Sequence, residues 1–106
     1  MSLEKNISRL LSRKDEIEER LSSSSLDTAD LMHLSKELSD LRPIAEQAAR
    51  VQKLKMELSD AEILVKDQEA DSEIVALAED EIQEILPKIN EAEYKLKLLL
   101  LPKDKD

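Results

Sequence analysis

The chain has 106 residues, 39% of them charged, and its 25 acidic and 16 basic side chains give a formal net charge of −9 at pH 7. It contains no glycine and no cysteine, which excludes glycine-rich phosphate loops, dinucleotide-binding fingerprints, disulfides and cysteine metal sites. No apolar run approaches the roughly 18 residues of a membrane span, and the first residues lack a signal peptide's apolar stretch. We therefore expect a soluble, cytoplasmic chain that does not contact membranes.

A first helix is expected over residues 2–22, because apolar residues recur there at spacings of three and four. The stripe consists of Leu3, Ile7, Leu10, Ile17 and Leu21, with Leu11 widening it. Four serines, 22–25, end the pattern, since serine competes for backbone hydrogen bonds and disfavours helix interiors. We interpret this serine run as a loop rather than a phosphorylation cluster.

A second, longer helix is expected from a cap at Asp27 or Thr28 to about residue 68. Its apolar positions are Leu31, Leu34, Leu38, Leu41, Ala48, Val51, Leu54, Leu58, Ala61 and Val65. Pro43 falls inside this run, where it removes a backbone donor and its ring clashes one turn back. We expect a kink near Pro43, or a short helix followed by a longer one.

A third helix is expected from a cap at Asp71 or Ser72 to about Leu100. Its apolar residues step by alternating four and three, which is a heptad seam: Ala78, Ile82, Ile85, Ile89, Ala92, Leu96 and Leu99. Pro87 lies off this seam and should bend the helix. The pattern predicts an all-α fold, a long antiparallel helical hairpin with the N-terminal helix packed alongside in a three-helix arrangement.

Little in the sequence indicates catalysis, and we assign no catalytic, cofactor-binding or metal-binding residue. His33 is the only histidine, and neither a cysteine nor a second histidine is present to complete a metal site. The carboxylates occur at helical spacing, where they should face solvent with nothing to raise a pKa. A module that binds or positions is the expected class.

Residues 69–84 contain seven acidic residues and no basic one. One interpretation is a solvated helix start, which the helix dipole favours. The other is a docking surface for a basic protein, for which the candidate contacts are Glu79, Asp80, Glu81 and Glu84. Because this segment should repel phosphate, we expect no direct nucleic-acid binding.

The C-terminal residues Leu98 to Leu101 are four consecutive leucines, followed by Pro102 and alternating charge. Four adjacent leucines cannot all lie on one stripe of a helix, so some should be buried against another body. This pattern predicts a helical domain over residues 1–101 and the start of a linker at 102–106. Leu98, Leu100 and Leu101 would contact the missing domains, and an isolated fragment could dimerise through them.

The arrangement resembles the N-terminal domain of bacterial class I peptide chain release factors. The segments that carry the resemblance are Ile17 to Leu21, Leu34 to Leu38 with Leu41-Arg42-Pro43-Ile44, Leu58 to Glu62, Leu77 to Ile82, and Leu98 to Asp104. The leucine–proline ending is the most specific of these, and it separates one bacterial class I factor from its sister.

The resemblance implies a fragment of a translation termination factor that directs stop-codon-dependent release of the nascent peptide on the ribosome. The decoding tripeptide and the Gly-Gly-Gln motif of the family would lie in the missing domains, since this chain has no glycine. This arm is then expected to contact the ribosomal stalk base and to catalyse nothing. The alternative is a generic acidic coiled-coil adaptor or oligomerisation module.

Overall fold

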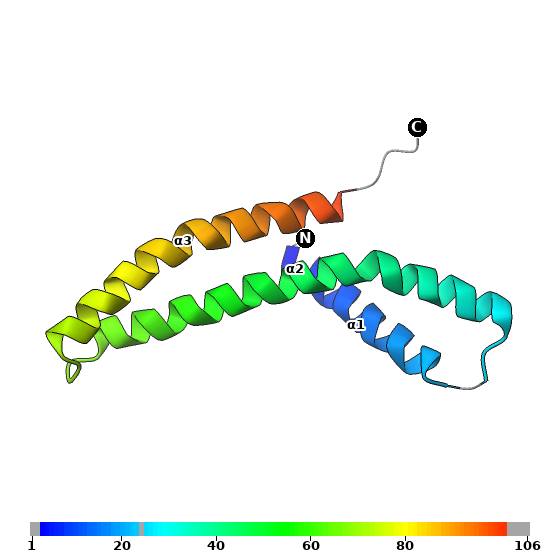
Figure 1. The fold of residues 1–106 in the computed structure, drawn as a ribbon, viewed down its shortest axis with the longest axis horizontal. Helices are drawn as coiled ribbons and strands as arrows, with labels where there is room; N and C mark the ends of the chain where they lie inside the picture. The colour runs from blue at the N-terminus through cyan, green and yellow to red at the C-terminus, as the bar shows by residue number, and fades with distance from the viewer. Residues whose placement is uncertain (1–2, 24, 102–106) are drawn as a thin grey trace. The chain divides into compact units, whose positions relative to one another are not determined.

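The computed structural model describes residues 3–23 and 25–101. These residues form three helices, α1 (Leu3–Leu21), α2 (Thr28–Lys66) and α3 (Ser72–Leu100), and contain no strand (Figure 1). The all-α prediction is confirmed. The chain divides into two compact units, Met1–Ala48 and Ala49–Asp106, and α2 contributes residues to both.

The first unit packs α1 against the first part of α2. The buried core there is a cluster of one α1 residue and three α2 residues: Ile17, Leu34, Leu38 and Leu41. Leu10, Leu21 and Leu26 are partly buried against this cluster. Three residues of the stripe predicted for the first helix, Leu10, Ile17 and Leu21, thus pack against the second helix, because each helix alone would leave its apolar side chains in water.

The loop between α1 and α2 is stabilised by side-chain hydrogen bonds at both ends. The Ser22 hydroxyl donates to the Glu19 carbonyl oxygen at 2.7 Å. At the other end, Asp27 Oδ1 accepts a hydrogen bond of 2.8 Å from the backbone N–H of Asp30. Asp27 therefore caps α2, as its place before the apolar run predicts.

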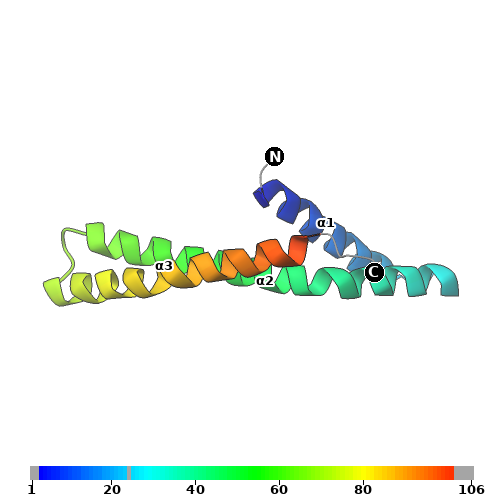
Figure 2. The same cartoon turned by 90° about the horizontal axis from the view of Figure 1, so that it is seen from above.

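The second unit is an antiparallel hairpin of the second part of α2 and α3, which lie side by side in both views (Figures 1 and 2). The buried residues are Val51, Leu54, Ala61, Ala78, Ile85, Ile89, Ala92 and Leu96. An ion pair of 3.1 Å between Lys55 Nζ and Glu93 Oε2 joins the two helices beside this seam. Five of the seven predicted seam positions of α3 are buried, whereas Ile82 is half-buried and Leu99 at the end of the seam is 42% exposed.

The turn between α2 and α3 is built by Asp67. Its Oδ1 accepts a hydrogen bond of 2.9 Å from the backbone N–H of Glu69, and its carbonyl oxygen accepts one of 3.3 Å from Ala70. Asp71 stands at the N-cap of α3 in an extended conformation, without a side-chain hydrogen bond to the helix. No described residue has a positive φ, so this turn forms without glycine.

Pro43 and Pro87 both lie inside continuous helices, α2 and α3. The expectation of a short helix followed by a longer one at Pro43 is therefore wrong, while a bend at either proline stays a prediction. The helix continues because packed residues flank Pro43 on both sides, Leu41 and Ala48, and such packing outweighs one lost hydrogen bond.

Candidate protein-docking surface

The predicted contact residues lie in the first half of α3, and the buried seam fixes how they are rotated. Ala78 and Ile85 are buried against α2, which leaves Glu79, Asp80, Glu81 and Glu84 exposed. With 3.6 residues per turn, Asp80, Glu81 and Glu84 fall on one flank of that seam and Glu79 falls on the other. The four candidates are thus not one cluster, and only three of them share a face.

The three carboxylates that share a face border an open groove between α2 and α3 with a volume of about 520 Å³. The residues that line it are Leu64 from α2 and Ile74, Leu77, Ala78, Asp80, Glu81 and Glu84 from α3. Leu64, Ile74 and Leu77 are 40%, 42% and 69% exposed. The groove therefore combines apolar side chains with an acidic rim, and Glu79 is not part of it.

The sequence prediction named only the acidic residues of this groove and not its apolar ones. The signal was available: Ile74 and Leu77 do not belong to the heptad seam, yet they precede Glu81 and Glu84 by seven residues each. Residues at such spacing occupy one flank of a helix. An apolar pair and an acidic pair on one flank indicate a contact surface better than the acids alone.

The rim carboxylates carry uncompensated charge. No ion pair joins Asp80, Glu81 or Glu84 to any residue in the described part of the chain. In the sequence, no Lys, Arg or His occurs between Lys66 and Lys88. The groove consequently presents a negative potential, which attracts a cationic partner and repels phosphate.

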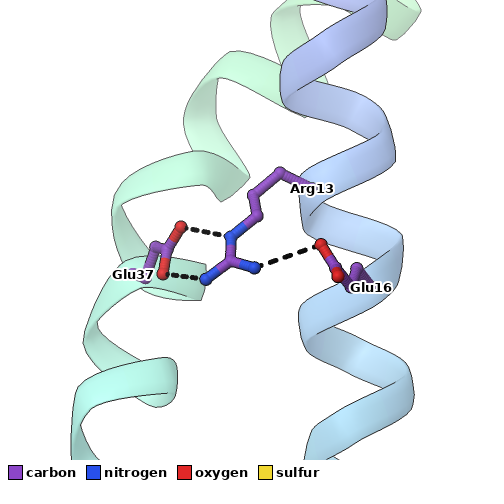
Figure 3. A network of polar contacts seen from close by, with 3 residues as sticks. All are labelled: Arg13, Glu16 and Glu37. Atoms are coloured by element: carbon purple, nitrogen blue, oxygen red, sulfur yellow. Dashed lines mark hydrogen bonds and ion pairs between the residues drawn. The ribbon is translucent and has the colours of Figure 1, made fainter.

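A different polar network lies in the first unit and serves packing. Arg13 on α1 donates from Nε to Glu37 Oε2 at 2.6 Å and from Nη2 to Glu37 Oε1 at 2.8 Å, while Nη1 contacts Glu16 at 3.1 Å (Figure 3). These hydrogen bonds hold the pKa of Glu37 below its usual value, and the same carboxylates raise the pKa of Arg13. The bidentate pair fixes the register of α1 on α2.

The C-terminal leucines differ in their exposure. Leu98 is 49% and Leu101 is 60% exposed, whereas Leu100 is half-buried. Their predicted contact with further domains stays a prediction, and the linker predicted at 102–106 lies outside the described residues.

The remaining expectations about sites concern His33 and membranes. His33 is exposed on α2, and residues 3–23 and 25–101 bring no three metal-binding side chains together. In the same ranges, no helix is both long enough and apolar enough to cross a bilayer.

These features define an acidic helical-hairpin module with an open groove of apolar and acidic side chains. Its sequence matches the PCRF domain over residues 10–106, and the chain belongs to this family. It is 39% identical over 111 residues to peptide chain release factor 1 of Wolbachia pipientis, covering the whole chain and 30% of that relative. It is also 38% identical over 104 residues to peptide chain release factor 1 of Rhodospirillum rubrum, covering 98% of the chain and 28% of the relative.

A third relative, peptide chain release factor 1 of Roseobacter denitrificans, is 43% identical over 77 residues, which cover 73% of the chain and 21% of the relative. The chain thus spans less than a third of the length of these relatives. No solved structure matches it. The resemblance to class I release factors read from the sequence is confirmed.

Proposed function

We propose that the chain is the non-catalytic helical arm of a release factor that directs stop-codon-dependent release of the nascent peptide on cytoplasmic ribosomes. The family match from residue 10 to residue 106 carries this proposal. The relatives named peptide chain release factor 1 support it, because they align with the chain over most of its length.

The arm itself performs no chemistry in this proposal. The chain has no glycine, so the Gly-Gly-Gln motif expected of the family would belong to the part of the parent that this chain does not span. The exposed leucines Leu98 and Leu101, with the half-buried Leu100, would then pack against that part. In an isolated fragment the same leucines could join two copies.

The arm would contact protein at the base of the ribosomal stalk rather than ribosomal RNA. Exposed Asp80, Glu81 and Glu84 have no described ion pair, and exposed Glu79 lies on the opposite flank. Such a surface favours a basic protein and disfavours phosphate.

The test is charge reversal in the full-length parent. Glu79→Lys, Asp80→Lys and Glu81→Lys together should lower ribosome affinity and the rate of peptide release at limiting factor by about tenfold. The matched control is Asp15→Lys, Glu19→Lys and Glu46→Lys, which makes the same change in formal charge at exposed positions of the first unit. Unchanged affinity and rate in the first variant would rule out this contact.

The alternative, a generic acidic coiled-coil adaptor or oligomerisation module, predicts a different sequence downstream in the gene. The reading frame downstream of Asp106 should encode a Gly-Gly-Gln motif if the chain is a release factor arm. A frame without that motif would favour the adaptor.

A further inference from the structure

The groove between α2 and α3 has a more specific use than a general acidic contact. We propose that it binds a basic amphipathic α-helix of a protein partner, with aliphatic side chains of that helix against Leu64, Ile74 and Leu77. Lysines or arginines of the same helix would lie against Asp80, Glu81 and Glu84. This inference deepens the proposed function and rests on it for the place where the partner occurs.

Three apolar side chains of the groove, Leu64, Ile74 and Leu77, lie outside the buried seam of the hairpin. The buried seam of α3 runs through Ala78, Ile85 and Ile89, whereas Ile74 and Leu77 remain 42% and 69% exposed. Leu64 faces them from α2 and is 40% exposed. Exposed apolar side chains that gather in one hollow mark a contact surface, because covering them releases water from apolar area.

Acidic residues continue the apolar surface of the groove toward the C-terminus of α3. Ile74, Leu77, Glu81 and Glu84 stand at i, i+3, i+7 and i+10 on α3, so they form a stripe about 15 Å long at 1.5 Å per residue. Its first half is apolar and its second half is acidic. A partner helix lying along the stripe would carry aliphatic residues on one turn and Lys or Arg on the following turns of the same face.

The geometry favours a helix over the other kinds of protein ligand. Among residues 3–23 and 25–101 there is no strand, so an extended peptide finds no sheet edge with which to pair. The groove runs between two helices whose backbone groups beyond the terminal turns are bonded within each helix, so recognition relies mainly on side chains. An amphipathic helix supplies aliphatic and cationic side chains together.

The charge of the groove also decides against a second copy of this chain. The chain carries a formal charge of −9, and a two-fold contact through the groove would bring the acidic rims of both copies into one interface. Because like charges in contact oppose association, a cationic partner is favoured.

A labelled synthetic peptide tests the proposal on the 106-residue chain. The probe is an amphipathic helix of about 18 residues that carries Leu on one turn and Lys on the following turns of the same face, long enough to be helical when bound. Its control has the same composition in an order that does not place the leucines and the lysines on one face. Fluorescence anisotropy at about 0.15 M salt should show at least fivefold tighter binding of the amphipathic peptide.

Separate variants test the apolar and the acidic parts of the groove, and the first removes apolar side chains. Ile74→Ser with Leu77→Ser should weaken binding of the amphipathic peptide at least tenfold. The control, Met56→Ser with Tyr94→Ser, removes side chains that are each 63% exposed in the same unit but do not line the groove, and should leave binding unchanged. Circular dichroism of every variant checks that helix content is retained.

The acidic part is tested by neutralising it. Asp80→Asn, Glu81→Gln and Glu84→Gln together should weaken binding at least tenfold, and the difference from the unsubstituted chain should shrink as salt is added. The control neutralises three exposed acids of the same unit that do not line the groove: Asp60→Asn, Glu62→Gln and Glu91→Gln. This control variant should change the affinity for the amphipathic peptide less than twofold.

Four peptide-binding results would overturn the proposal. These are the absence of saturable binding, equal binding of the two peptides, full binding by the Ile74→Ser, Leu77→Ser variant, and full binding by the variant with a neutralised rim. Sedimentation showing a dimer that the two serine substitutions dissolve would also overturn it, because a second copy would then occupy the groove.

Failure of this inference can be told apart from failure of the proposed function. If charge reversal in the full-length parent slows peptide release while Ile74→Ser and Leu77→Ser change neither release nor peptide binding, only the groove proposal fails. If the groove binds the amphipathic peptide through Ile74 and Leu77 while both variants of the parent release peptide normally, only the ribosomal role fails.

Discussion

Arg13 and Glu37 lie 24 positions apart in the sequence, yet the guanidinium of one donates two hydrogen bonds, of 2.6 and 2.8 Å, to the carboxylate of the other (Figure 3). Each residue borders the apolar cluster of the first unit: Arg13 stands one turn before Ile17, and Glu37 precedes Leu38. The bidentate geometry of the pair thus fixes the register between α1 and α2, which apolar packing alone does not specify.

Glu37→Gln should reduce stability at neutral pH modestly, lowering Tm by no more than about 5 °C, because both side chains are about a third exposed. The Arg13 hydrogen bonds lower the pKa of Glu37 in the folded chain. Its stabilising contribution is therefore present above the unfolded pKa and is lost as the pH falls through the folded pKa.

Urea unfolding of the unsubstituted chain and of the Glu37→Gln variant at pH 7 and at pH 3 measures this effect. The stability difference between them should narrow at the lower pH. Glu19→Gln, at an exposed position of α1, provides the control and should show no such narrowing. A gap that stayed constant with pH would mean that the Arg13 pair does not depend on the ionised carboxylate.

Ile17→Ala should destabilise the first unit by about 2–5 kcal/mol, since Ile17 is fully buried and the substitution leaves a cavity among Leu34, Leu38 and Leu41. Chemical denaturation followed by circular dichroism measures the loss. Ile63→Ala makes the same change at a side chain that is 63% exposed and should cost less than about 0.5 kcal/mol. Equal losses in the two variants would contradict the observed core.

Ala61→Leu should destabilise the second unit by about 1–3 kcal/mol, because Ala61 is fully buried where α2 meets α3 and a larger side chain would force the helices apart. Ala76→Leu places the same side chain at an exposed position of α3 and should be close to neutral. Thermal unfolding of both variants checks the contrast, and a stabilising Ala61→Leu would show that the seam has unfilled space.

Pro43→Ala should stabilise the chain by about 1–3 kcal/mol. The side chain of Pro43 is exposed inside α2, and alanine restores the backbone donor that proline lacks. Pro87→Ala should act likewise in α3. Urea titration of each variant measures the gain, with Glu46→Ala as an exposed control near Pro43 that keeps the backbone donor. A loss of stability would indicate that the helix needs the backbone conformation that the proline imposes.

The parts of the fold that repeat along a helix could be predicted from the sequence, because burial follows periodicity. The heptad positions Ile85, Ile89 and Leu96 are all buried, as the pattern predicts. Periodicity identifies the apolar face of a helix but does not show where the helix packed against that face ends. Leu99 therefore continues the pattern and is still exposed. Likewise, the presence of Pro43 in the sequence does not show that α2 continues through it, because that continuity depends on packing on both sides of the proline.

The site was harder to predict because its parts come from two elements. Asp80, Glu81 and Glu84 were recognisable as an acidic run, but the groove also requires Leu64, which stands ten residues before Ile74 and on the other helix. Only the hairpin turn brings them together. The Arg13–Glu37 pair is a similar case, since no local pattern joins residues 24 positions apart.

Three of the eight buried residues of the hairpin are alanines: Ala61, Ala78 and Ala92. Such small side chains bring the helices together closely but remove little hydrocarbon from water. The heat-capacity change of unfolding and the dependence of the unfolding free energy on denaturant both scale with the surface area that unfolding exposes. The hairpin should therefore have a flat stability curve and a broad melting transition. A ligand that covers the groove adds apolar contact that the alanine seam does not supply, and calorimetry should show it as a sharper transition at higher temperature.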